Sequence, residues 1–398
     1  MRFIFLTLGY HPDQIGGAFR YVAETAERLA ARGHEVHAVY PAAPDGETGD
    51  SLLNGVQRHR FVNGTANFAA NWRAENRAAQ VVLTKLAADG RPTLLVNCHA
   101  FFGPAQRSWS GPQAYLFTGP WAEEFLFSRQ TRPRGKAGRI FDQFVAAIMR
   151  RVERSSLRRS GCLLTISDYY IAALRDWHPG PLPPVKMVSG GTDFRRFQPD
   201  AGRQEFRAAR GVAADDFLLL TVRRLDARMG LLMLLESFAG LVKEFPRARL
   251  WLAGRGPQES ALREAIVRLE LAGRVELLGF VPEDDLPRIY SAADCTLMPS
   301  LDLEGFGLAT VESLACGTPV LGSRAGATPE LLSRLDPALL FEPGSAEALT
   351  QRLRELLGGG LALPSRERCA VYARTQFSWD RPADGLEAAF RELVGGAA

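Results

Sequence analysis

The segment Pro299–Gly322, which reads PSLDLEGFGLATVESLACGTPVLG, combines carboxylates with a glycine-rich turn. Glu304 opens the turn Gly305–Gly307, and Glu312 follows with seven residues between the two glutamates. A helix predicted to begin near Leu308 would offer free N–H groups to a phosphate oxygen, and glycines would let that oxygen approach the backbone. The two carboxylates would suit polyhydroxylated groups such as ribose and hexose. A plain helix start with two solvated glutamates is the alternative, which the segment as a whole disfavours.

Other motifs occur along the chain in a fixed order. The first half contains DQIGGAFRYVAETAERLAARGHEVHAV, and SDYYIAAL and VSGGTDFRRFQPD lie near the middle. TVRRLDARMG, LAGRGP and LGFVPEDDLPRIYSAADCTLMPS follow in the second half. With the E-x7-E pair Glu304 and Glu312, these segments resemble the retaining glycosyltransferase family 4 over nearly the whole chain. The resemblance implies an α/β architecture, the GT-B fold, in which two doubly wound Rossmann-like domains face a cleft.

The resemblance also implies that this chain binds a nucleotide-sugar donor. Gly16 and Gly17 would form an N-terminal loop that closes over the donor's phosphates, and Arg224 would neutralise the diphosphate leaving group. Glu312 would hold the ribose hydroxyls. The sugar and phosphates would be held by Glu304 and by the backbone of Gly305, Phe306, Gly307 and Leu308. The base would lie near Phe280 and Val281.

The implied chemistry needs no metal and no cofactor other than the donor, which we expect to be linked to UDP or GDP. A sugar 1-diphosphate loses its diphosphate while positive charge grows at the anomeric carbon. Fixed cations and backbone dipoles stabilise the negative charge that develops on the leaving group. The resemblance thus implies three catalytic residues, which are Arg224, Glu304 and Thr118.

One departure from the family pattern concerns a phosphate-binding cation. The family usually has a lysine immediately before the glycine of this block, and here that position is Met229. The adjacent Arg228 could supply the charge, because a planar guanidinium can grip a diphosphate with two hydrogen bonds. A solvated arginine that contacts no ligand is the alternative.

A second departure lies in YLFTGPWAEEF, where Thr118 stands in place of a histidine that the family places near the sugar. Threonine can donate one hydroxyl hydrogen bond, but it cannot act as an imidazole donor. Either the enzyme does without the histidine, or its activity is reduced or altered. His99, in VNCHAF after a predicted strand, is a further candidate on the acceptor side, with a structural role as the alternative.

Other signals for metal or cofactor binding are weak. The triplet DLE at 302–304 resembles a DxD metal motif, but it lies inside the E-x7-E segment, so we expect no metal site. Gly254–Gly256 does not continue as GxGxxG, which disfavours a nicotinamide dehydrogenase. The cysteines are odd in number and widely spaced, which favours buried, reduced thiols over disulfides or zinc ligands: Cys98, Cys162, Cys295, Cys316 and Cys369.

A basic stretch covers residues 129–159, where ten arginines or lysines accompany two acids, Asp142 and Glu153. Apolar residues with helical spacing lie among the charges: Phe141, Phe144, Val145, Ile148, Met149 and Val152. A basic amphipathic segment of this kind could contact anionic lipid or grip an anionic acceptor. A domain helix with a solvated basic face is the simpler alternative.

The composition is that of a soluble globular protein, with 46% hydrophobic and 23% charged residues. The net charge of +4 requires no nucleic-acid partner. No segment approaches the ~18 unbroken apolar residues of a membrane-spanning helix. The N-terminus, MRFIFLTLGYHP, indicates a buried first strand rather than a signal peptide.

Strands and helices alternate along both halves of the chain, which predicts two parallel α/β domains. In the second half the pattern predicts strands over 217–222, 248–253 and 295–298 and a helix over 308–315. We expect an acceptor-side domain over residues 1–198 and a nucleotide-sugar-binding domain over 199–378, with a helix over 379–398 packing back on the first. The join, Gln198–Gly211, is polar and without periodicity, and Pro41–Ser51 is expected to be a loop.

Together these features predict a cytoplasmic retaining glycosyltransferase, either free or at the inner face of the membrane. It would move a hexose-type sugar from a nucleotide-diphosphate donor to an acceptor hydroxyl on a glycan, a lipid-linked sugar or a small-molecule aglycone. Two alternatives stay open. One is a catalytically impaired nucleotide-sugar-binding protein, motivated by Thr118. The other is a nucleotide-sugar epimerase of the same fold, which the E-x7-E motif disfavours.

Overall fold

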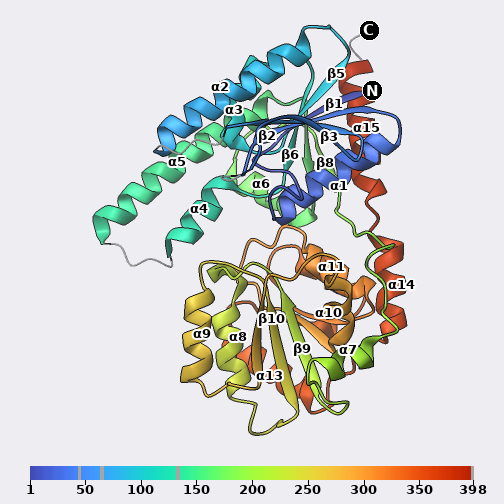
Figure 1. The fold of residues 1–398 in the computed structure, drawn as a ribbon. Helices are drawn as coiled ribbons and strands as arrows, with labels where there is room; N and C mark the ends of the chain where they lie inside the picture. Colours follow the sequence, from blue (N-terminus) through green and yellow to red (C-terminus); the bar gives the residue numbers. More distant parts are fainter. Residues whose placement is uncertain (44–45, 63–66, 131–134, 396–398) are drawn as a thin grey trace. The chain divides into compact units, whose positions relative to one another are not determined.

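The computed structural model describes residues 1–43, 46–62, 67–130 and 135–395. The chain forms two compact units: Met1–Gly190 with Trp379–Ala398, and Gly191–Ser378. Each unit is a mainly parallel sheet covered by helices on both faces (Figure 1). The predicted pair of parallel α/β domains is thus confirmed.

The described residues of the first unit form eight strands and the helices that connect them. Its strands are β1 (Arg2–Leu6), β2 (Glu35–Pro41), β3 (Gly49–Leu53), β4 (Val56–Phe61), β5 (Thr93–Asn97), β6 (Gln113–Phe117), β7 (Cys162–Thr165) and β8 (Val185–Met187). Its helices are α1 (Gly17–Ala31), α2 (Phe68–Ala87), α3 (Gly103–Ser108), α4 (Trp121–Gln130), α5 (Lys136–Arg159), α6 (Asp168–Trp177) and, from the end of the chain, α15 (Asp380–Gly395).

The strand order in this sheet is β3-β4-β2-β1-β5-β6-β7-β8, so the order reverses between β1 and β5. Side chains of β1 alternate between the two faces of the sheet, as in any strand. Ile4 and Leu6 belong to a core that includes Leu83 of α2. On the opposite face, the Phe3 ring packs 5.3 Å from that of Phe390 in α15. The buried first strand expected from the sequence is therefore present.

The C-terminal helix α15 packs on the first unit, where it contacts α1 and β5. Arg32, at the end of α1, forms ion pairs with three acids along one side of α15: Asp380, Asp384 and Glu387. Apolar packing by Phe390 and this exposed charge pairing together explain why the end of the chain belongs to the unit in which the chain begins.

A hairpin, β3–β4, occupies part of the region that the sequence predicts to be a loop. β3 pairs antiparallel with β4, with Asp50 opposite His59, and lies at the edge of the sheet. Most of β3 is exposed, so its sequence, GDSLL, lacks the apolar alternation that reveals a half-buried strand. The prediction of a loop over Pro41–Ser51 is thus wrong at Pro41, which ends β2, and from Gly49 onward.

The second unit contains six parallel strands in the order β11-β10-β9-β12-β13-β14. The strands are β9 (Phe217–Val222), β10 (Ala248–Ala253), β11 (Val275–Gly279), β12 (Cys295–Met298), β13 (Val320–Ser323) and β14 (Leu340–Phe341). The helices are α7 (Arg203–Ala209), α8 (Leu231–Ala239), α9 (Glu259–Arg268), α10 (Leu286–Ala292), α11 (Leu308–Ala315), α12 (Thr328–Leu332), α13 (Ala346–Leu357) and α14 (Arg366–Gln376). Helices α8, α9 and α13 cover one face, and α7, α10, α11 and α14 lie on the other (Figure 1).

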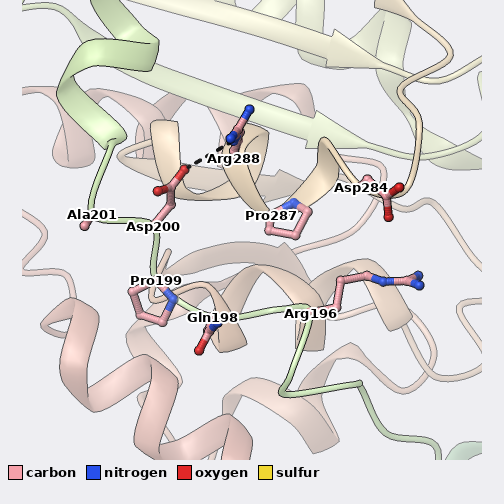
Figure 2. Close-up of a pocket in the computed structure, with 8 residues that line it drawn as sticks. All are labelled: Arg196, Gln198, Pro199, Asp200, Ala201, Asp284, Pro287 and Arg288. Atoms are coloured by element: carbon pink, nitrogen blue, oxygen red, sulfur yellow. Dashed lines mark ion pairs between the residues drawn. The ribbon is translucent and has the colours of Figure 1, made fainter.

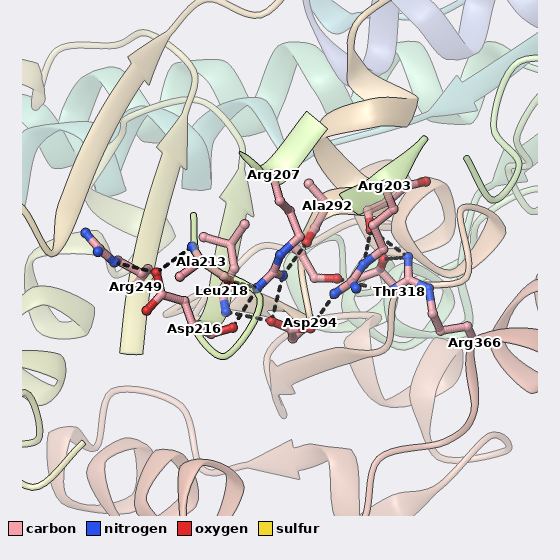
Figure 3. Close-up of polar contacts among 12 residues, drawn as sticks. Arg203, Arg207, Ala213, Asp216, Leu218, Arg249, Ala292, Asp294, Thr318 and Arg366 are labelled. Carbon is pink, nitrogen blue, oxygen red and sulfur yellow. Dashed lines mark hydrogen bonds and ion pairs between the residues drawn. The ribbon is translucent and has the colours of Figure 1, made fainter. Parts of the chain in front are cut away.

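Helix α7 forms within the polar segment for which the sequence predicts no periodic structure. Its Arg207 is 2% exposed and donates to four acceptors: the carboxylate of Asp294 and the carbonyl oxygens of Ala213, Asp216 and Ala292. These contacts lie beside the N-terminal ends of β9 and β12 (Figure 3). A charged residue therefore anchors α7, which a search for apolar periodicity does not detect.

Asp294 is the shared acceptor of this network. It pairs with both Arg203 and Arg207, and its Oδ2 atom also accepts from the backbone N–H of Leu218 at 2.7 Å. Arg366 adds a donor to Thr318 Oγ1 at 2.9 Å (Figure 3). The network lies at the sheet edge opposite the carboxyl ends of the strands, so its role in stability is spatially separate from a ligand site there.

Arg207→Met is expected to lower the free energy of unfolding by about 3 kcal/mol, because it leaves buried carbonyls and one side of Asp294 without their donor. Chemical denaturation followed by circular dichroism measures this loss. The matched control is Arg210→Met, one turn later and exposed, which should change stability by no more than about 0.5 kcal/mol. Equal losses in the two variants would contradict the anchoring role of Arg207.

All five cysteines are buried and free, as the sequence predicts. None of the helices in the described ranges is long and apolar enough to cross a membrane.

Candidate active site

The segment Pro299–Gly322, with the E-x7-E pair, begins at the carboxyl end of β12. β12 and β9 are the neighbouring strands between which the order of the second sheet reverses. Arg223 follows β9 directly, and Ser300 and Glu304 lie in the loop after β12. In doubly wound sheets, ligands bind in the crevice at such a reversal, because the loops leave the sheet there in opposite directions. The topology therefore selects this edge as the ligand site of the second unit.

Two glycines hold the loops of this edge close together. A Cβ atom on Gly230, which has a φ of +70°, would lie 2.0 Å from the carbonyl oxygen of Pro299. A Cβ atom on Gly326, with a φ of +55°, would lie 2.2 Å from the carbonyl oxygen of Glu304. The same carbonyl accepts from the N–H of Ala327 at 2.8 Å. The backbone of Glu304 is thus fixed by close contact with the loop after β13.

Arg223 and Glu304 form a buried ion pair at the centre of the site. Arg223 Nη2 lies 2.6 Å from Glu304 Oε2, which also accepts from Ser300 Oγ at 2.9 Å. The side chain of Glu304 is only 13% exposed. No described residue hydrogen-bonds its other oxygen, Oε1, which leaves that atom available to a hydroxyl group of a ligand.

The charges around Glu304 keep it ionised. Burial raises the pKa of the Glu304 carboxyl, but Arg223, Arg228 and the Ser300 hydroxyl lower it more, so the net pKa lies below the ordinary value. Burial in turn lowers the pKa of Arg223, which the neighbouring Glu304 carboxylate partly offsets. Arginine begins from a pKa above 12, so the guanidinium stays charged.

Arg228 also contributes to the site, through the backbone. Its Nη1 atom donates to the carbonyl of Leu303 at 2.9 Å, and its own carbonyl accepts from the N–H of Leu301 at 2.7 Å. Leu303 has a φ of +55°, a conformation that costs a non-glycine residue energy and tends to occur at functional sites. Arg228 thus holds the strained turn that presents Glu304.

The turn Gly305–Gly307 leads directly into α11, as predicted. Gly307 caps the helix with a φ of +88°, and no side chain of the described residues hydrogen-bonds the first N–H groups. An uncapped helix N-terminus attracts anions through these N–H groups and the helix dipole. The backbone of Gly305, Phe306, Gly307 and Leu308 therefore has the geometry that a phosphate group needs.

Glu312 lies in the second turn of α11 and is buried. Its Oε2 atom accepts from the hydroxyl of Tyr290 in α10 at 2.9 Å. Tyr290, which the sequence analysis does not identify, orients the second glutamate of the E-x7-E pair.

Arg224 and Phe280 are exposed at the same sheet edge. The Arg224 side chain is 71% exposed, and its nearest acid is Asp226 at 3.9 Å. Phe280 follows β11, with the Arg255 guanidinium 5.9 Å from its ring centre, and Val281 beside it is partly exposed. Of the two adjacent arginines 223 and 224, the structure brings the first to Glu304 and leaves the second in solvent.

In the first unit, the predicted loop lies at the corresponding reversal point, between β1 and β5. Gly16 precedes α1, and within the described ranges no side chain caps the N-terminus that begins at Gly17. The loop is braced from behind by Asp13, which accepts from Arg58 Nη1 at 2.8 Å and from the hydroxyl of Tyr40 at 2.7 Å. The first N–H groups of α1 are thus open to a ligand.

His99 follows β5, the other strand at this reversal. Its Nδ1 atom accepts from the N–H of Phe101 at 3.1 Å, so the proton of a neutral imidazole is on Nε2. The ring makes an edge contact with Trp121 at 5.5 Å. Burial lowers the pKa of His99 to about 4, which keeps the ring neutral near pH 7.

Thr118 follows β6, one strand beyond the reversal, and is partly buried. Its hydroxyl makes no hydrogen bond with another described residue. Because β5 and β6 are parallel neighbours, His99 and Thr118 emerge at the same edge of the first sheet.

A shallow pocket of about 290 Å³ lies elsewhere in the second unit (Figure 2). Its charged lining residues are Arg196, Asp200, Asp284 and Arg288, of which Arg288 and Asp200 lie 3.9 Å apart. It contains none of the predicted site residues. The opposite charges of its lining largely offset each other, so we do not assign the active site to this pocket.

Four further residues of the site were not predicted from the sequence: Arg223, Ser300, Tyr290 and Arg255. For Arg223 and Ser300 the one signal is position, since they follow the predicted strands 217–222 and 295–298 almost directly. Their roles depend on partners far along the chain, such as Arg223 and Glu304, which are 81 residues apart.

Comparison with known proteins covers both units. The family model described as Glycosyltransferase Family 4 matches residues 15–196, and that described as Glycosyl transferases group 1 matches residues 202–376. A D-inositol 3-phosphate glycosyltransferase of Segniliparus rotundus is 29% identical over 218 residues, which are 54% of this chain and 48% of that protein. The alignment thus spans about half the length of that relative.

A second relative aligns along nearly the full chain. It is a GDP-mannose-dependent alpha-(1-6)-phosphatidylinositol monomannoside mannosyltransferase of Mycobacterium tuberculosis, 26% identical over 400 residues, covering 96% of each protein.

Solved structures show the same fold. Sucrose-phosphate synthase of Thermosynechococcus elongatus superposes with a TM-score of 0.81 at 22% identity and covers 100% of both chains. The Anabaena protein HepE, solved with UDP-glucose, has a TM-score of 0.75 at 20% identity and covers 99% of this chain and 100% of that one. With both halves matched in order, the chain belongs to the family 4 glycosyltransferases, with the GT-B fold and a group 1 glycosyltransferase domain in its second half.

Proposed function

We propose that this protein is a retaining, metal-independent hexosyltransferase that uses a nucleoside-diphosphate sugar and glycosylates an acceptor hydroxyl. The observation that carries the proposal is the ionised Glu304, held by Arg223 beside the uncapped N-terminus of α11 at the reversal point of the second sheet. A carboxylate that accepts hydrogen bonds from sugar hydroxyls, next to a helix N-terminus that binds anions, suits a sugar joined to a phosphate.

Each part of the donor has a partner in this proposal. The first N–H groups of α11 hold the diphosphate, and Glu304 Oε1 accepts a hydrogen bond from a sugar hydroxyl. Glu312, oriented by Tyr290, takes the ribose hydroxyls. The exposed ring of Phe280 supports the base, with Val281 and Arg255 beside it. Among the relatives, one is named for GDP-mannose and one was solved with UDP-glucose, which supports a GDP- or UDP-linked donor.

The proposed chemistry is electrostatic. As the bond from the anomeric carbon to the diphosphate oxygen breaks, negative charge develops on the leaving group. The α11 N-terminus, Arg228 and the exposed Arg224 lie where they can stabilise that charge. The Arg224 side chain is 71% exposed, with Asp226 3.9 Å away, so it can turn toward a phosphate, whereas Arg223 is held by Glu304. In this proposal, these cations take the role that a metal has in other transferases.

The acceptor side of the proposal rests on the first unit, where the Nε2–H group of His99 offers a donor at the reversal point. The names of the relatives, an inositol phosphate and a phosphatidylinositol mannoside transferase, support an acceptor that carries hydroxyl and phosphate groups.

A second candidate is a protein that binds nucleotide sugar without transferring it. The observation that favours it is Thr118, whose hydroxyl cannot replace a histidine donor. Binding without turnover in the wild type, together with turnover gained in Thr118→His, would support this candidate over the transferase.

The transferase proposal predicts that Glu312→Ala and Arg224→Ala each lower kcat/KM at least about tenfold, because each removes a contact to the donor. A thermal-shift screen against nucleotide sugars first identifies the donor, since a ligand that binds the folded state raises the Tm. Hydrolysis and transfer of that donor are then measured. Full activity in both variants would show that the site is assigned to the wrong residues. Unchanged Tm without donor confirms that the variants are folded.

A further inference from the structure

The outward face of α5 carries large apolar side chains that the fold leaves in solvent. Ile140, Phe141, Phe144 and Ile148 are 71%, 59%, 64% and 49% exposed. Their spacing of three and four residues puts them on one side of the helix. Figure 1 shows this N-terminal half of α5 extending with α4 beyond the sheet of the first unit. Residues 131–134, the remainder of this part of the basic stretch, lie outside the described residues.

The opposite side of the same helix already packs into the first unit. Ala146 and Met149 form a small core with Ala122, Phe125 and Leu126. The exposed apolar residues are therefore not needed to attach α5, and a second apolar face on an attached helix requires another explanation.

The charges on α5 are divided between the same two sides. Both acids, Asp142 and Glu153, are buried on the inner side. The exposed charged residues of α5 are all cations, which form no ion pair with another described residue: Lys136, Arg139, Arg151, Arg158 and Arg159. We call Ile140, Phe141, Phe144 and Ile148, together with Lys136 and Arg151 on the same side of the helix, the α5 outer face.

Other described helices expose fewer large apolar side chains, which are Phe68 and Val81, far apart on α2, Val267 on α9 and Val371 on α14. Isolated residues of this kind are normal on protein surfaces, whereas a contiguous patch marks an interaction site. Two phenylalanines and two isoleucines between unpaired cations form such a patch.

We propose that the α5 outer face binds the surface of an anionic phospholipid bilayer. The helix lies in the plane of the interface, with Phe141, Phe144, Ile140 and Ile148 inserted among the acyl chains. Lys136 and Arg151 contact the phosphate groups. A helix with aromatic residues on one stripe and cations beside it has the arrangement that favours this location. An ordinary apolar protein partner would not explain why every acid of α5 lies on the inner side.

The test is cosedimentation of the full chain with vesicles. Wild type is expected to bind vesicles of equal parts phosphatidylcholine and phosphatidylglycerol, to bind pure phosphatidylcholine weakly, and to lose affinity as NaCl is raised. Phe141→Ser/Phe144→Ser should lower the affinity at least about tenfold. Lys136→Gln/Arg151→Gln should lower it by a similar factor at low salt and reduce its salt dependence.

Matched controls come from α2 of the same unit. Val81→Ser removes an exposed apolar side chain, and Arg73→Gln/Arg77→Gln removes two exposed cations, so both should bind as wild type does. All variants should keep the wild-type Tm, because the altered side chains are exposed.

Three results would overturn the proposal. The first is that wild type fails to bind the anionic vesicles. The second is that the phenylalanine variant binds them as wild type does. The third is that the protein has no affinity for vesicles but self-associates as its concentration rises, and that the phenylalanine substitutions abolish this association. That result would assign the α5 outer face to a second copy of the chain.

Discussion

Arg223→Met is expected to lower kcat/KM at least about a hundredfold and the free energy of unfolding by about 3–5 kcal/mol. The substitution leaves Glu304 buried without its cation, and the carboxylate must then move, bind a proton or draw in water. Since Arg223 acts on the donor through Glu304, it is a positioning residue rather than a catalytic one. Steady-state kinetics well below the Tm, together with denaturant titration, measures the two effects separately.

Two further variants show where the loss originates. Arg223→Met/Glu304→Leu replaces the whole ion pair by apolar groups, which often costs little stability. It should therefore recover most of the stability of wild type while activity stays low. Arg224→Met, at the exposed neighbour, should lower activity and leave the free energy of unfolding unchanged. If the double variant were no more stable than Arg223→Met, the ion pair would not be the source of the destabilisation.

His99→Asn is expected to lower kcat/KM about a hundredfold with little change in Tm. Asparagine Oδ1 can still accept from the Phe101 N–H, so the local turn is kept while the Nε2–H donor is lost. In the proposed function, His99 supplies the donor that Thr118 cannot. Adding Thr118→His to His99→Asn should then restore part of the lost activity, since both residues emerge at the same sheet edge.

The pH dependence of the same reaction gives an independent check. Burial lowers the pKa of His99 to about 4, below the ordinary value of 6.5, so the imidazole is neutral above about pH 5. Loss of activity through its protonation should appear only as the pH falls toward 4. The catalytic role of His99 would be contradicted if activity fell with an apparent pKa near 6.5, or if His99→Asn kept the wild-type kcat/KM. The ring would then serve only in its contacts with Phe101 and Trp121.

Many elements could be predicted because they are buried on both faces. The strands Phe217–Val222, Ala248–Ala253 and Cys295–Met298 agree with prediction at both ends, since a parallel strand covered by helices is a short unbroken apolar run. Helix α11 also agrees, because the glycine turn before it and Gly317 after it limit its length. The β3–β4 hairpin and α7 escaped prediction, because edge exposure and a buried arginine replace the apolar pattern there.

By itself, the sequence determined the family, the two α/β units and the loops that carry chemistry, because these depend on local patterns and on the order of motifs. The tertiary structure alone decided which of two adjacent arginines is buried against Glu304. Neighbouring side chains leave the end of a strand in opposite directions, and only the fold brings the loop after β12, 81 residues away, to one of them. It also decided that the acids of α5 face inward while its phenylalanines face solvent, since the helical pattern has two apolar sides and packing selects one.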